Sequence, residues 1–388
     1  MRPEHSRRAF LQRTGAAALI PTIAGSARVA SAAPARPLAP VGIARCKAYD
    51  PEVVLRELEG LMDRIGGVQK LVAGKTVAVK GNLVGDVRAD TLGKPANRTY
   101  QVNPTMVLAV AALLDRAGAR RIRFLESTHQ TQPFEPYLHA AGWDLDALRG
   151  TKTPVEFEDT RNLGKGKKYH EVKVPTGGSL FPAYHVNHSY VDCDVYVSLA
   201  KLKNHATAGV TLGMKNNFGV TPIALYGQPE QKEDSTSSRS MFHDGKTRPA
   251  DGLPQELHPD SPRRPPYRVP RHAVDAVGIR PIDLVILDGI ETVSGGEGPW
   301  VPGGLKVQEP GLLIAGRNPV CTDAVATAVM GYDPTAAPGT GPFPGDNHLA
   351  IAAALGLGDN DVKRIEVVGL PLARALHPFG WEPSERSV

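Results

Sequence analysis

The sequence predicts an α/β fold in which a largely parallel sheet is flanked by helices, arranged as two α/β lobes around a cleft. Short runs rich in β-branched residues alternate with amphipathic helical stretches along the chain, which is the pattern of parallel βαβ units. Several of these runs end in charged or amide side chains. Strands end in this way where an open parallel sheet binds its ligand.

The first half of the chain supplies alternating helices and strands. Asp50 before Pro51 predicts the start of a helix that Gly66 ends, and Asn103 before Pro104 predicts the start of another. The further elements expected here are strands at 76–79, 122–125, 155–157 and 172–174 and a short helix at 135–141.

The second half begins with a central strand at 195–197 and then loses its periodicity. Residues 227–268 are rich in Pro, Ser, Lys, Arg and Asp, and compact domains rarely contain so long a structureless loop, so we expect a lid or a flexible insertion. The domain as a whole should span 40–370, with a C-terminal tail at 371–388. The elements expected after the insertion are helices at 272–277, 319–330 and 349–355 and strands at 284–287, 312–315 and 365–368.

The central strand leads into the most distinctive stretch of the chain. Lys201, Lys203 and His205 alternate after it, and alternation in an extended chain places all three on one face. A glycine-rich segment with Lys215 and Asn216 follows, and glycine lets a backbone approach a ligand closely. The alternative is a rim of solvated charges, because charged residues are mostly exposed. The apolar character of the following segment favours a binding site.

Polar side chains also follow three other expected strands. Lys80 and Asn82 follow one, Glu126 and His129 another, and Asp288 a third. Because parallel strands end at the same edge of a sheet, we expect them to join the central cluster in one cleft. The alternative for the carboxylates is capping of the turn that follows. The expected roles are catalysis for His205, His129, Glu126 and Asp288, and ligand binding for Lys80, Asn82, Lys201, Lys203, Lys215 and Asn216.

The N-terminal residues predict an export signal. Residues 6–11 (SRRAFL) form a twin-arginine pattern, an alanine-rich apolar run follows, and residues 30–32 (ASA) suit a signal peptidase. We therefore expect residues 1–32 to be a cleaved signal that the twin-arginine machinery recognises, and a periplasmic or extracellular protein. No later stretch approaches ~18 consecutive apolar residues, so no stable membrane span is expected after cleavage.

Charge and cysteine content limit the possible partners. The chain carries a net charge of +5, and residues 1–32, with five arginines and one glutamate, account for +4 of it. A nearly neutral remainder gives no reason to expect a nucleic-acid partner. Cys46, Cys193 and Cys321 are far apart and form no CxxC, so we expect no chain-bound iron–sulfur cluster. They allow one disulfide and one thiol, and Cys193 and Cys321 have the settings of buried structural thiols.

Four segments resemble an uncharacterised family, the domain of unknown function 362. They are VAVKGNL at 77–83, the K-x-K-x-H element with GVTLGMKNNFG within 201–219, DGI with GEGP within 288–299, and AGRNPV with DAVA within 315–326. They follow the family order, so the resemblance covers about 40–370. Asp323, in the last segment, should be either a buried partner of a lysine or the polar edge of a helix.

The resemblance implies little about activity. Some relatives carry an appended ferredoxin-like cluster module, and because the sequence has no CxxC we do not expect one here. The layout is distantly similar to that of nickel-dependent lactate racemases, an analogy of fold alone. It would allow the histidines to act as proton-transfer bases while the lysines hold a carboxylate or phosphate. Two hypotheses follow: a cationic cleft that binds an anionic small molecule or cofactor and catalyses acid–base chemistry, or a non-catalytic exported anion-binding protein. A redox-associated accessory protein is a third option, and cofactor and metal stay open.

Overall fold

One eight-stranded sheet forms the centre of the fold, in the order β16-β1-β15-β12-β9-β2-β5-β6. The computed structural model describes residues 38–129, 132–160, 169–227, 239–301 and 304–383. The strands of this sheet are β1 (Val41–Arg45), β2 (Thr76–Lys80), β5 (Arg121–Glu126), β6 (Val155–Asp159), β9 (Val195–Lys201), β12 (Leu284–Gly289), β15 (Leu312–Gly316) and β16 (Val367–Gly369).

The sheet is mostly parallel, as the sequence predicts. β12, β9, β2, β5 and β6 pair in parallel in that order, whereas β15 is antiparallel to both β12 and β1. β1 completes the sheet between two late strands, because Val41 lies opposite Gly316 of β15 and opposite Val367 of β16. An α/β fold with a largely parallel sheet is therefore confirmed.

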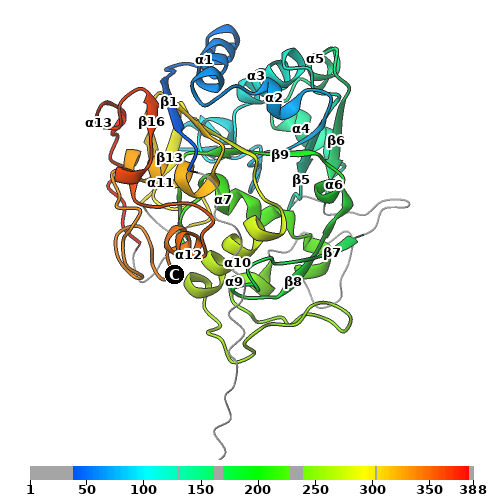
Figure 1. The fold of residues 1–388 in the computed structure, drawn as a ribbon, viewed down its shortest axis with the longest axis vertical. Coiled ribbons are helices and arrows are strands. Elements are labelled where there is room, and N and C mark those ends of the chain that lie inside the picture. The colour runs from blue at the N-terminus through cyan, green and yellow to red at the C-terminus, as the bar shows by residue number, and fades with distance from the viewer. Residues whose placement is uncertain (1–37, 130–131, 161–168, 228–238, 302–303, 384–388) are drawn as a thin grey trace, which may run out of the picture. The chain divides into compact units, whose positions relative to one another are not determined.

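Helices cover both faces of the sheet (Figure 1). On one face lie α1 (Pro51–Arg64), α2 (Gln69–Val72), α3 (Pro104–Arg116), α4 (Phe134–Ala140) and α5 (Leu145–Arg149). On the other face lie α7 (Leu212–Asn216), α10 (Pro265–Ile279), α11 (Pro319–Val329) and α12 (His348–Ala354). The remaining short helices are α6 (His188–Val191), α8 (Ile223–Tyr226), α9 (Ser240–His243) and α13 (Leu372–Ala375).

In the part of the chain that the structure describes, four small hairpins and three 3₁₀ turns lie outside the main sheet. The turns are η1 (Ala96–Arg98), η2 (Asn217–Val220) and η3 (Val362–Arg364). The hairpins pair β3 (Asp90–Thr91) with β4 (Lys94–Pro95), β7 (Tyr169–Lys173) with β8 (Ala183–Asn187), β10 (Asn204–His205) with β11 (Gly209–Val210), and β13 (Thr292–Ser294) with β14 (Lys306–Gln308).

Alternate residues of each central strand belong to different cores. In β2, Val77 and Val79 pack in the core under α1 and α3, whereas Ala78 packs in the core under α10 and α11. A parallel sheet buried on both faces produces this division, and it explains why the central strands are almost uniformly apolar. Helix starts follow the predicted capping residues: Asp50 caps α1 and Asn103 caps α3 through their side-chain oxygens.

Two expectations about domain organisation have different outcomes. The described residues belong to one compact unit, so a cleft between two lobes is not confirmed. The predicted signal at 1–32 lies outside the described residues, as do residues 228–238 of the predicted insertion and residues 384–388 of the predicted tail.

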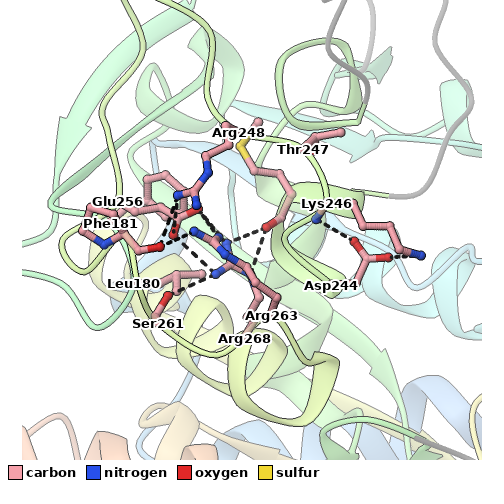
Figure 2. A network of polar contacts seen from close by, with 12 residues as sticks. Leu180, Phe181, Asp244, Lys246, Thr247, Arg248, Glu256, Ser261, Arg263 and Arg268 are labelled. Carbon is pink, nitrogen blue, oxygen red and sulfur yellow. Dashed lines mark hydrogen bonds and ion pairs between the residues drawn. The ribbon is translucent and has the colours of Figure 1, made fainter.

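Buried ion pairs hold together the part of the insertion that the structure describes. It contains α9 and the first turn of α10, so the helix expected at 272–277 in fact begins at Pro265. The fully buried Arg268 donates to Glu256 at 3.0 Å, and Arg263 donates to the same carboxylate at 2.6 Å (Figure 2). Because the carboxylate joins two arginines, this stretch can order without the apolar periodicity that a sequence reveals.

Two further observations bear on the sequence expectations. No helix in the described part of the chain is long and apolar enough to cross a bilayer. Cys46, Cys193 and Cys321 are all unpaired, and burial raises the pKa of the Cys46 thiol to about 11. Burial also raises the pKa of the Cys193 and Cys321 thiols. A high pKa makes a thiol unreactive, which fits the structural role expected of these two cysteines.

Candidate functional site

A pocket of about 400 Å³ opens at the carboxyl edge of the sheet. It lies beyond the ends of β2, β5 and β9, where parallel α/β sheets bind their ligands. Its walls also include α7, η2, α9 and the segment that follows β13. The charged and titratable residues that line it are Lys80, Glu126, His129, Lys203, His205, Lys215, Arg239, His243 and Glu297.

Lys80 and Glu126 form a buried ion pair in the wall of this pocket. The Lys80 ammonium lies 2.8 Å from one Glu126 carboxylate oxygen and also donates to Gly81 O at 2.9 Å and to Asn216 Oδ1 at 3.2 Å. The Glu126 carboxylate accepts from the N–H groups of Leu83 and Ser127 as well. All three ammonium protons are therefore used, so this pair contributes structure and little net charge.

Lys201 and Asp288 form a second buried pair, and neither lines the pocket. Their charged groups lie 2.9 Å apart, and both side chains are 0% exposed. Tyr49 donates to Asp288 at 2.9 Å, and Lys201 donates to the Tyr49 oxygen at 3.0 Å. The structure therefore separates Lys201 and Asp288 from the other predicted site residues, and the predicted convergence of all of them in one cleft does not occur.

Lys203 and Lys215 are the two lysines of the pocket that form no ion pair with a carboxylate of the described residues. Lys203 donates to the backbone oxygen of Glu297 at 2.8 Å, and burial lowers its pKa to about 8. The Lys215 ammonium lies 4.0 Å from the centroid of the Phe218 ring. Among the described residues, no carboxylate lies within ion-pair distance of Lys203 or Lys215.

His205 contacts the carboxylate of Glu297. Its Nδ1 accepts hydrogen bonds from the N–H groups of Thr207 and Ala208, both at 3.2 Å, so the ring proton must sit on Nε2. Nε2 lies 2.6 Å from a Glu297 oxygen, although at an angle outside that of a hydrogen bond. Burial lowers the pKa of His205 to about 4. Because neither ring nitrogen is left to accept a proton, His205 is better placed to orient Glu297 than to act as the expected base.

Arg239 and His243 complete the polar lining from the side of α9. Arg239 donates to Thr221 O at 2.6 Å and to Gly219 O at 3.2 Å, and burial lowers its pKa to about 10, which leaves it charged at neutral pH. His243 Nδ1 lies 3.0 Å from the backbone oxygen of Arg239. Nδ1 therefore carries the proton, and the lone pair of Nε2 remains available to a ligand.

Backbone features hold the glycine-rich segment of the site in place. Leu212 has a φ of 48°, a left-handed conformation that is unusual for a branched residue and concentrates at functional sites. The amides that follow, of Gly213 and Met214, donate to Asp323 at 2.9 and 2.7 Å. The sequence analysis expected Asp323 to be either the partner of a lysine or the polar edge of a helix, and it is neither. It caps the start of α7.

Glycine at position 219 lets the site close around the first ion pair. A Cβ placed there would lie 2.4 Å from Lys80 Cε and 3.3 Å from Glu126 Oε1. No side chain fits such a gap without displacing the lysine. The K-N-N-F-G run of the sequence therefore ends in glycine for steric reasons.

The structure gathers most, but not all, of the predicted site residues. Lys80, Asn82, Glu126, His129, Lys203, His205, Lys215 and Asn216 line the pocket, whereas Lys201 and Asp288 do not. Asn82 Oδ1 and Ser127 Oγ are buried in its wall without a hydrogen-bond partner among the described residues. Sequence analysis missed Arg239, His243 and Glu297. Glu297 belongs to the GEGP element, so that element offered a signal, but nothing in the loop-like composition around Arg239 did.

The side chains that the structure describes include no cluster of three or more His, Cys, Asp or Glu suited to a metal ion.

The thylakoid-associated protein sll1697 of Synechocystis sp. is 27% identical to this chain over 302 residues, which is 77% of this chain and 76% of the relative. The model of the domain of unknown function DUF362 matches residues 77–328, a span that holds every residue lining the pocket. The chain therefore belongs to the DUF362 family.

Proposed function

We propose that the pocket binds an anionic small molecule. The observation that carries this proposal is its charge balance. Among the described residues, Lys203, Lys215 and Arg239 line the pocket with no carboxylate within ion-pair distance, and Glu297 is the carboxylate whose charge acts on Lys203 and Lys215. Burying cations without partners is costly, and a bound anion offsets that cost. The carboxylate of Glu126 is already committed to Lys80.

The pocket also has the groups for acid–base chemistry. His243 offers an Nε2 lone pair, and Lys203, with a pKa of about 8, can donate a proton near neutral pH. We therefore favour an enzyme over a binding protein. An enzyme of this kind should exchange the acidic methyl hydrogens of an oxo acid such as pyruvate with solvent, whereas a non-catalytic anion-binding protein would bind pyruvate without that exchange. NMR in deuterated water distinguishes the two.

Anion binding can be tested by calorimetric titration with phosphate, oxalate and glyoxylate. Lys203→Met should weaken binding of the best of these ligands by about tenfold or more, because it removes a buried positive charge. Lys215→Met should weaken binding less, because the pKa of Lys215 is about 7 and only part of its amine is charged at neutral pH. Lys246→Met is the matched control, since that side chain is 81% exposed and lies outside the pocket. Equal affinities in all three variants would refute the proposal that the anion binds in this pocket.

We further propose that the protein is exported by the twin-arginine route to the periplasm or the extracellular space. The support is the SRRAFL sequence at residues 6–11 and the small residues at 30–32. Replacing Arg7 and Arg8 together with lysine should leave the precursor in the cytoplasm. Normal export of that double variant would refute this route.

A further inference from the structure

The four buried lysines near the strand ends differ in what neutralises them. Lys80 and Lys201 each lie within 3 Å of a carboxylate, at 2.8 and 2.9 Å. Lys203 donates to a backbone oxygen. Lys215 is 8% exposed, yet it has no hydrogen-bond acceptor among the described residues, and the face of the Phe218 ring is its neighbour at 4.0 Å. Its nitrogen is therefore the one most available for chemistry.

The surroundings of Lys215 also favour its neutral form. Burial is the main cause, and the nearby positive charges of Lys203 and Arg239 act in the same direction. The negative charge of Glu297 raises the pKa of Lys215, but by less than burial and the two positive charges lower it, so the pKa falls to about 7. At that pKa about half of the amine is neutral at pH 7, roughly a thousandfold more than for an ordinary lysine. A neutral amine carries the lone pair that a nucleophile needs.

We propose that Lys215 forms a Schiff base with the aldehyde or ketone carbonyl of a small anionic ligand, that is, with an oxo acid. This inference rests on the proposed anion-binding function and narrows its ligand class. Lys203 and Arg239 hold the acid group of the ligand, and the amine of Lys215 acts on its carbonyl. The Phe218 ring helps to cover the amine, and this burial is the main cause of the lowered pKa of Lys215, although the π face of the ring by itself attracts an ammonium group.

The step balances without any oxidant or reductant. The lone pair of the Lys215 nitrogen attacks the carbonyl carbon, a C–N bond forms, and the π electrons of the carbonyl move to its oxygen. His243 takes a proton from the nitrogen, and the ammonium of Lys203 protonates the oxygen. The protonated His243 then gives its proton to the departing hydroxyl, which leaves as water while a C=N bond forms, and the remaining N–H proton returns to Lys203. One amine and one carbonyl thus give one imine and one water.

Reductive trapping tests the proposal on the full chain. We would incubate the protein with glyoxylate and cyanoborohydride near pH 7 and map carboxymethylated lysines by peptide mass spectrometry. Lys215 should be modified at least about tenfold faster than Lys246, an exposed lysine of the same molecule that serves as internal reference. Lys215→Arg should lose the fast modification, and Lys246→Arg should keep it. The wild-type peptide map does not depend on whether the arginine variant folds.

A titration with glyoxylate and with its carbonyl-free analogue glycolate separates this proposal from the previous one. If both bind and Lys203→Met weakens them, but Lys215 is modified no faster than Lys246, the Schiff base is refuted and anion binding stands. If glyoxylate, glycolate, phosphate and oxalate all fail to bind and no fast modification occurs, both proposals fail. Fast modification confined to Lys215 supports both.

Discussion

Replacing Lys201 or Asp288 should cost stability rather than ligand affinity. The two groups lie 2.9 Å apart, and both side chains are 0% exposed, so removing one leaves the other buried and unpaired. The largest possible loss of stability is the free energy needed to neutralise the charged group that is left without its partner. At pH 7 that is roughly 5 kcal/mol for a lysine and roughly 4 kcal/mol for an aspartate. Asp288→Asn should approach this limit because the Lys201 ammonium would keep only neutral acceptors, the new amide oxygen and the Tyr49 hydroxyl, with no negative charge to offset its own.

Lys201→Met should cost less, about 2–3 kcal/mol, because Asp288 would still accept from Tyr49 and from the N–H of Asn103. The double variant should recover most of the loss, since neither charge is then buried alone. Urea unfolding at pH 7 measures these differences, and calorimetric titration should give unchanged anion affinity in each folded variant. Stability within about 1 kcal/mol of wild type, together with lost affinity, would return both residues to the site and refute this reasoning.

Three further changes test other parts of the structure. His348 is buried, neither of its ring nitrogens has a hydrogen-bond partner among the described residues, and burial lowers its pKa to about 3. Because the pKa is lower in the folded than in the unfolded protein, the stability that the neutral ring contributes is present above about pH 6.5 and is lost as the pH falls. Relative to His348→Leu, the wild type should thus lose roughly 2 kcal/mol more of its urea unfolding free energy between pH 6.5 and 4.5, and parallel profiles would contradict this. Gly219→Ala should lower thermal stability by about 1–3 kcal/mol because its Cβ would collide with Lys80, and an unchanged melting temperature would mean that the lysine simply moves aside. Glu256→Gln should speed proteolysis within 239–268 because Arg268 loses its buried partner, whereas an unaltered digestion pattern would show that the pair does not hold this segment.

Much of the fold could be predicted because its strands and helices carry strong local signals. The apolar runs that became β2, β9 and β12 are buried on both faces, and helix starts at Asp50 and Asn103 are marked by capping side chains followed by proline. β1 escaped prediction because its short run is interrupted by Gly42. β7 was expected at nearly the right place, but its partner β8 was not, so its separate hairpin could not be foreseen.

Only the part of the candidate site that lies at the ends of parallel strands could be predicted from the sequence. Parallel strands bring Lys80 and Lys203 to one edge, and both line the pocket. Sequence alone could not show that Lys201 pairs with Asp288 outside the pocket lining, because that depends on which carboxylate the neighbouring strand presents. Arg239 was missed for a related reason, since backbone oxygens of Gly219 and Thr221 position it and leave no trace in the pattern.

The position of β1 has a consequence for how the chain can be assembled. Val41 pairs with residues that follow it by more than 270 positions in β15 and more than 320 in β16. During synthesis the first strand therefore has no partner until nearly the whole chain has left the ribosome. A fragment cut to the family-matched span, 77–328, would keep every residue of the pocket, yet it would expose the edge of β15 where β1 belongs. Such a fragment would tend to pair with other chains, because an open strand edge is a template for aggregation.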